Sequence, residues 1–189
     1  MVPPEYANFL IASTGASAAL LGLLFVSVSI APERVFGESA KAGHRALALS
    51  SFTALANAFF ISLSGLIPNV PFGLFVIIVG GVALSQSLSL LATARDWRLE
   101  RRLLRGVILF AASVAVYGSE LVIGIDLYVN KPSPELITAL LQLLLAVFAM
   151  GLARAWELLG APRARGLVSA SVEWAEDKLE KKSDKPPPK

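Results

Sequence analysis

The sequence contains no cysteine and a single histidine, His44. Without cysteine the chain has no disulfide, no thiolate metal site and no thiol redox chemistry. This excludes the disulfide oxidoreductases that work with quinones in membranes. A single histidine also excludes bis-histidine haem ligation and histidine-rich metal centres. We therefore expect neither a cofactor nor a metal site.

Charged residues are scarce as well. They make up 16% of the 189 residues, whereas hydrophobic residues make up 55%, and an ordinary soluble domain has about 25% charged residues. Long charge-free runs separate the basic blocks, which is typical of a membrane protein. The net charge of +3 is modest. Because the basic residues flank apolar segments and are not interleaved with aromatic residues, we expect no nucleic-acid partner.

Enzyme motifs are also missing from the sequence. Neither HExxH nor GxSxG occurs, and there is no aspartate cluster that could hold a divalent metal and a phosphate substrate. The chain is therefore predicted not to be an enzyme. The N-terminal residues MVPPEYAN lack the basic region of a cleaved signal peptide, so we expect the first apolar segment to remain in the mature protein.

Five apolar segments are long enough to cross a bilayer, which takes about 20 residues. We predict an all-α, polytopic membrane protein whose membrane domain covers residues 1–162. Its transmembrane helices are expected at about residues 8–31, 44–67, 70–94, 106–128 and 134–159. A cytoplasmic amphipathic helix at residues 163–182 and a disordered tail at residues 183–189 are expected to follow.

Prolines mark the ends of several of these helices. Pro32 ends the first segment, and the turn Pro68-Asn69-Val70-Pro71 predicts an antiparallel hairpin of the second and third segments. Ser133 is expected to cap the fifth helix, with Pro134 at its first position. The pair Gly80-Gly81 predicts a close helix contact or a bend in the third segment.

The orientation follows from the distribution of Lys and Arg. Sixteen of the 17 basic residues fall on one side of the predicted membrane domain, in residues 32–45, 95–105 and 154–189, which are connections, the tail and the helix ends beside them. The positive-inside rule places this side in the cytoplasm, so the N-terminus lies outside and the C-terminal tail inside. Aromatic residues expected at the two interfaces agree with this orientation: Tyr6 and Tyr128 outside, Trp97 and Trp156 inside. We expect a multi-pass protein of the cell membrane, namely a bacterial inner membrane.

The fourth segment contains Glu120, the only acidic residue placed well inside an apolar segment. A carboxylate at this depth is costly and marks a functional site by default. Because desolvation disfavours the charged form, we expect Glu120 to be partly protonated at neutral pH. Spacings of four, three and four residues place it on one helix face with Ser113, Tyr117 and Gly124.

Residues from four segments are expected near the level of Glu120 and could form one polar layer. The predicted ion, proton or solute site consists of Glu120, Tyr117, Ser113, Asn57, Gln142, Thr14 and Ser17. The same residues also allow a purely structural role, in which a protonated Glu120 bonds Tyr117, Asn57 or Gln142 and links the helices. Asp126 could attract cations to an outer mouth, although interfacial acids are common.

Two further sets of residues are candidates for binding lipid or protein. The basic block is a candidate for contacts with anionic lipid heads: Arg95, Arg98, Arg101, Arg102 and Arg105. Oligomerisation is predicted through a small-residue face of the first segment and an apolar seam in the tail: Gly15, Ala19 and Gly22, then Val168, Val172, Ala175 and Leu179.

The sequence is compatible with three functions. The first is a small homo-oligomeric channel or passive conduit for ions or protons, with Glu120 as its intramembrane acidic group. The second is a non-catalytic scaffold or regulatory subunit that packs against a partner membrane protein. A weaker third is lipid binding or transport through the arginine block. Membrane lipids are expected partners in every case.

Overall fold

The computed structural model describes residues 2–30, 32–37, 42–94, 103–130 and 133–158. A single 3₁₀ turn, η1 (Pro4–Tyr6), precedes α1 (Ala7–Ile30), the short α2 (Glu33–Phe36) and α3 (Ala42–Leu66). Next comes α4 (Phe72–Ala94), which forms a hairpin with α3. The described part ends with α5 (Leu103–Val129) and α6 (Pro134–Leu158). All regular structure within these ranges is helical, as expected.

Five of these helices are long and apolar enough to span a membrane. The shortest, α4, has 23 residues and therefore a length of about 35 Å at 1.5 Å per residue, against about 30 Å for the hydrocarbon core of a bilayer. The number of spanning helices agrees with the expectation from the sequence. Several residues of the predictions lie outside the described residues: Arg95, Trp97, Arg98, Arg101, Arg102 and the apolar seam in the tail.

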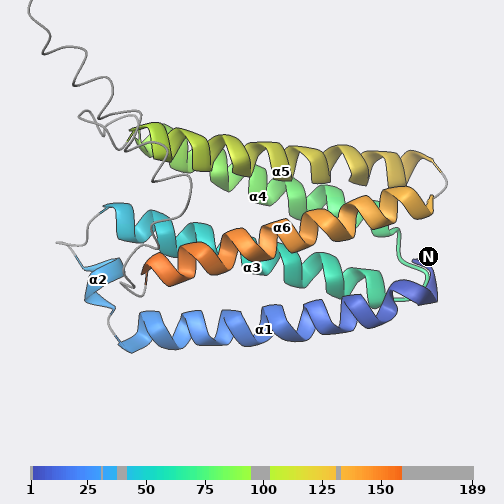
Figure 1. Cartoon of the computed structure of the whole chain (residues 1–189), viewed down its shortest axis with the longest axis horizontal. Helices are drawn as coiled ribbons and strands as arrows, with labels where there is room; N and C mark the ends of the chain where they lie inside the picture. The colour runs from blue at the N-terminus through green and yellow to red at the C-terminus, as the bar shows by residue number, and fades with distance from the viewer. Residues whose placement is uncertain (1, 31, 38–41, 95–102, 131–132, 159–189) are drawn as a thin grey trace, which may run out of the picture. The chain divides into compact units, whose positions relative to one another are not determined.

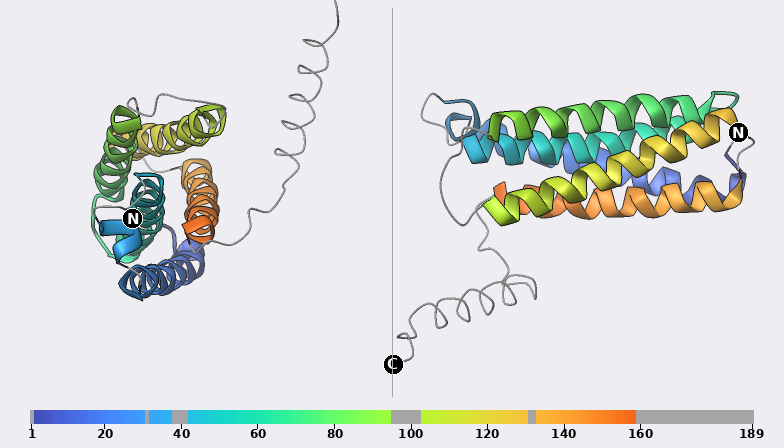
Figure 2. Two further views of the ribbon diagram at one scale, coloured as in Figure 1. Left: turned by 90° about the vertical axis from the view of Figure 1, so that its left-hand side faces the viewer. Right: turned by 90° about the horizontal axis from the view of Figure 1, so that it is seen from above.

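The five long helices run side by side as a bundle, with α3 in its middle (Figures 1 and 2). α3 contacts α1, α4 and α6, whereas α5 packs mainly on α4. Small and apolar α3 residues such as Ala54, Ala58 and Ile61 are completely buried. Polar groups carried by α3 are consequently enclosed by its neighbours.

The outer faces of the bundle are strongly apolar. Large hydrophobic side chains are more than half exposed on several different helices, among them Leu23 and Phe25 of α1, Ile78 of α4, Val122 of α5 and Leu145 of α6. A water-soluble protein rarely exposes so much apolar surface. These faces suit contact with lipid and agree with a multi-pass membrane protein.

Local chain chemistry explains where the helices end. α3 stops two residues before Pro68, and Asn69 in the following turn has a positive φ of 61°, a conformation that Asn tolerates better than most residues. The Ser133 hydroxyl accepts a hydrogen bond from the Leu136 N–H at 3.3 Å, and Pro134 opens α6. The predicted cap of this helix is therefore confirmed.

Glycines hold α4 and α5 close together. A Cβ atom on Gly73 of α4 would lie 2.5 Å from the Tyr128 nitrogen, and one on Gly124 of α5 would lie 3.0 Å from the Ile77 nitrogen. Gly80 also faces α5, whereas Gly81 has open space beside it. The close contact expected at Gly80-Gly81 thus involves Gly80, and Gly73 and Gly124 extend it.

Candidate functional site: a buried polar chain between α3, α5 and α6

Glu120 lies in the interior of the bundle and is completely buried. Its carboxylate Oε2 accepts a hydrogen bond of 2.8 Å from Asn57 Nδ2 of α3. A Cβ on Gly80 of α4 would lie 3.5 Å from the Glu120 Cβ. Three helices therefore enclose the carboxyl group, and one of them supplies a polar partner.

The predicted polar face of α5 is turned into the bundle. Ser113, Tyr117 and Glu120 are between 0% and 3% exposed, and Gly124 of the same face is buried as well. Along this face, Ser113 lies seven residues before Glu120, or about 10 Å at 1.5 Å per residue. The face is a line of polar side chains that runs through the bundle interior.

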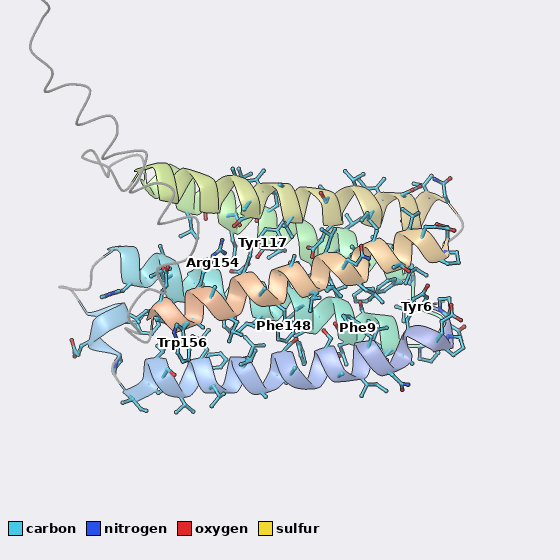
Figure 3. All side chains as sticks on the ribbon, in the orientation of Figure 1. Tyr6, Phe9, Tyr117, Phe148, Arg154 and Trp156 are labelled. Carbon is cyan, nitrogen blue, oxygen red and sulfur yellow. The ribbon has the colours of Figure 1, made fainter. Side chains whose placement is uncertain are left out.

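Arg154 of α6 extends this line toward the other end of the bundle. Its side chain is 8% exposed, and its Nη2 donates a 2.5 Å hydrogen bond to the Ser113 hydroxyl. The Tyr117 hydroxyl interacts electrostatically with both Arg154 and Glu120, and Figure 3 shows Tyr117 and Arg154 as neighbours inside the bundle. We call these five residues, Asn57, Glu120, Tyr117, Ser113 and Arg154, the polar chain.

Arg154 and Glu157 are three residues apart near the end of α6, and this spacing by itself predicts an ion pair at the helix end. A second pattern in α6 indicates instead that Arg154 is buried. The buried residues of α6 follow spacings of three and four and end at Arg154: Ile137, Leu140, Leu144, Val147, Gly151 and Arg154. Arg154 therefore continues the core face of the helix. Weighing this spacing against its charge would have placed it inside.

Three other predicted members of the layer lie apart from the polar chain. Gln142 is on the exposed side of α6. In α1 the Thr14 hydroxyl bonds the Leu10 carbonyl at 2.8 Å, and the buried Ser17 bonds the Ser13 carbonyl at 2.6 Å. Both α1 hydroxyls thus serve their own helix. The single polar link from α1 to α3 in the described part joins Ser62 to the Ser13 hydroxyl at 2.8 Å.

The remaining candidates are peripheral. Asp126 is half-buried near the end of α5 and accepts a hydrogen bond from the Asn130 side chain. Arg105 lies in the first turn of α5. Gly15, Ala19 and Gly22 are on the exposed side of α1, and a Cβ on either glycine would meet no atom within 4 Å. This small-residue face is available to lipid or to another protein.

Hydroxyl and amide side chains of α3 and α4 form a second polar layer nearer the predicted inner end, and most of its hydrogen bonds are local. Ser51, Ser85 and Ser87 donate to carbonyls of their own helices at 2.8–2.9 Å. One bond joins two helices, from the Thr53 hydroxyl of α3 to Gln86 Oε1 of α4 at 2.5 Å. This layer therefore serves helix packing.

A separate cavity of about 270 Å³ lies at the opposite end of the bundle, and its lining includes Phe72, Leu127 and Ile137.

No protein-family model matches the chain, and no match was found among curated proteins or solved structures. What the chain does is therefore inferred from its own geometry. That geometry places a buried carboxyl, a buried guanidinium and three other polar groups in one line. Among the described residues, no three His, Cys, Asp or Glu side chains lie close enough together to hold a metal ion.

Proposed function

We propose that the protein is a small membrane conduit for protons, with Glu120 as the group that takes up and releases the proton. One observation carries the proposal: Glu120 is completely buried among spanning helices and bonded to Asn57, with further polar groups in line with it. Ionisable residues at such depth are costly and mark ion or proton paths in membrane proteins.

The depth of the polar chain supports this function. Glu120 and Asn57 each lie nine residues before the end of their helix, or about 14 Å at 1.5 Å per residue. Ser113 lies about 24 Å from the same end by the same measure. Asn57, Glu120 and Ser113 therefore lie in the central part of the span, where apolar helices present the highest barrier to a charge, and Arg154 lies nearer the other end.

Protons suit this geometry better than hydrated ions. A hydrated ion needs an open water-filled path, whereas the polar chain consists of tightly enclosed side chains with exposures of 8% or less. Asn57 and Glu120 form one hydrogen-bonded pair and Arg154 and Ser113 another, and a proton can move between such groups without an open water-filled path. The chain therefore favours a proton over Na⁺ or K⁺ as the species that crosses.

The proposal keeps the N-terminus outside and the tail in the cytoplasm of a bacterial inner membrane, as the distribution of basic residues predicts. It also keeps a homo-oligomer, which the open small-residue face of α1 would allow. Glu120 is enclosed by helices of its own chain. Each protomer is therefore proposed to contain its own path.

Flux measurements in liposomes test this proposal. Purified protein is reconstituted with a pH-sensitive dye inside, a K⁺ gradient and an ionophore set the membrane potential, and Na⁺ flux is followed in parallel. The proposal predicts acidification or alkalinisation that follows the potential, without Na⁺ flux. Liposomes whose proton permeability equals that of empty controls at several pH values would contradict it.

A non-catalytic scaffold or regulatory subunit is the second candidate. It is favoured by α1, whose exposed glycines 15 and 22 leave room for a close helix contact. The substitution Gly22→Leu would fill that room. If the protein does not conduct and this substitution abolishes its assembly with itself or with a membrane partner, the scaffold function replaces the conduit.

A further inference from the structure

Three oxygen atoms of the polar chain are buried without a hydrogen-bond partner: Asn57 Oδ1, the Tyr117 hydroxyl and Glu120 Oε1. Their side chains are between 0% and 3% exposed. Buried polar atoms in proteins nearly always have partners, either protein groups or ordered water. Three such atoms in neighbouring residues indicate that the site binds a small polar ligand.

The three atoms belong to one site. Asn57 and Glu120 are joined by the 2.8 Å bond between Nδ2 and Oε2, so their other oxygens are on groups already in contact. Tyr117 precedes Glu120 by three residues on the same buried face, and its hydroxyl interacts electrostatically with the carboxylate. On the α4 side, Gly80 offers no side chain that could serve as a partner.

We propose that Asn57 Oδ1, the Tyr117 hydroxyl and Glu120 Oε1 together bind one water molecule. Asn57 Oδ1 can only accept a hydrogen bond, and Glu120 Oε1 can only accept when the carboxyl is ionised. A water molecule donates to both and accepts from the Tyr117 hydroxyl. The three bonds equal the number that a buried water typically makes, about three.

The same water also fits the protonated carboxyl. Glu120 Oε1 then carries the hydrogen and donates to the water, which donates in turn to Asn57 Oδ1 and to the Tyr117 oxygen. Only the water and the Tyr117 hydroxyl reorient between the two arrangements. Each of the three oxygens then has the water as a partner in both states, so the site can gain or lose a proton without leaving any of these oxygens unpaired.

A monovalent cation is the main alternative ligand, because its charge would offset that of an ionised Glu120. The geometry favours water, since the Arg154 guanidinium interacts with the Tyr117 hydroxyl and would repel a cation placed beside it. The proposal does not depend on transport. The site would hold its water in a scaffold as well as in a conduit.

Crystals of the full-length protein grown from a lipid phase, with Tl⁺ in place of Na⁺ and K⁺, would test the proposal directly. We expect a density peak at about 2.7–3.0 Å from all three oxygens, the range of ordinary hydrogen bonds, without anomalous scattering. An anomalous peak at this point would show a cation and overturn the proposal. Direct bonds among the three side chains, with no peak between them, would also overturn it.

Infrared spectroscopy provides a second, independent readout in lipid. The bound water should give an O–H band that shifts in H₂¹⁸O and is lost in both Glu120→Leu and Tyr117→Phe. Tyr128→Phe is the matched control. It also removes a tyrosine hydroxyl, but Tyr128 lies at the end of α5, away from the site, and is 55% exposed. A band that persists in Tyr117→Phe would contradict the assignment, whatever the flux measurements show.

Discussion

At the scale of single residues, the most informative contact is the hydrogen bond between Asn57 and Glu120. It joins two polar side chains that are 3% and 0% exposed, in a region where both would be costly alone. An amide donor beside a carboxyl stabilises the charged form and still leaves one oxygen of each group for a ligand. This contact is therefore central to the structure of the site and to the proposed function.

Replacing Asn57 with leucine removes this donor while retaining a side chain of similar size. We expect Asn57→Leu to lower the free energy of unfolding by about 1–3 kcal/mol, because Glu120 Oε2 becomes a buried acceptor without its donor. Denaturation in mixed detergent micelles measures the change. Asn8→Leu is the control, since Asn8 is exposed on α1.

A double-mutant cycle attributes this loss to the contact itself. In a Glu120→Leu background, Asn57→Leu should have a clearly smaller effect, because the acceptor is already absent. Equal losses in the two backgrounds would show that Asn57 stabilises the bundle without help from Glu120.

The second residue-scale prediction concerns Ser113. Its buried hydroxyl accepts the 2.5 Å hydrogen bond from Arg154, so Ser113→Ala should destabilise the protein by about 1–3 kcal/mol. Ser119→Ala on the same helix is the matched control, because Ser119 is exposed and bonds only the Ala115 carbonyl at 2.8 Å in the described contacts. Its effect should stay within about 0.5 kcal/mol. Similar losses for the two serines would contradict the assigned role of Ser113.

Part of this site was predictable from the sequence and part was not. Helical spacing alone places Ser113, Tyr117 and Glu120 on one face, and depth counted from the helix ends brings Asn57 to the same level. Depth does not determine the direction of a side chain, however. Gln142 has a suitable depth but points away from the bundle, whereas Arg154 points inward with the core residues of α6.

At the scale of helices, glycine determines how closely α4 and α5 approach. Apolar side chains gain little from meeting each other inside a bilayer, so association depends on close packing. Gly73 and Gly124 provide it, because a Cβ on either would lie 3.0 Å or less from backbone atoms of the other helix. The pairing of α4 with α5 turns Glu120 toward Gly80 and Asn57.

Alanine substitutions on α4 test this packing. Gly73→Ala should destabilise the protein by about 1–3 kcal/mol through overpacking, since its Cβ would lie 2.5 Å from the Tyr128 nitrogen. Gly81→Ala on the same helix has open space and should be neutral or slightly stabilising. Thermal denaturation of both variants in detergent provides the comparison. Equal stability would contradict the close approach.

Helix ends were largely predictable, because proline and serine act locally. The Ser133 cap, the Pro134 start and the turn at Asn69 depend on neighbouring residues alone. Which helices contact each other was harder to predict from the sequence. The sequence indicates a hairpin of α3 and α4, but it does not indicate that α3 is central and that α5 packs mainly on α4.

At the scale of the whole molecule, orientation is the clearest expectation that remains to be measured. Single cysteines can be introduced without background, because the native chain has none. Glu135→Cys at the start of α6 should react with a membrane-impermeant maleimide added outside intact cells. Glu33→Cys in α2 should react only after permeabilisation. The reverse pattern would invert the proposed topology.

Proton flux through Glu120→Gln, compared with wild type in the same liposomes, is the most direct test of the central claim. The amide keeps the size of the side chain but cannot exchange a proton. We expect flux to fall by about tenfold or more, since positioned proton-transfer groups contribute about 10²–10⁴-fold to rates in enzymes. Glu135→Gln makes the same chemical change at an exposed position and should conduct like wild type. A folded Glu120→Gln protein with unchanged proton flux would contradict the claim that protons pass through this carboxyl group.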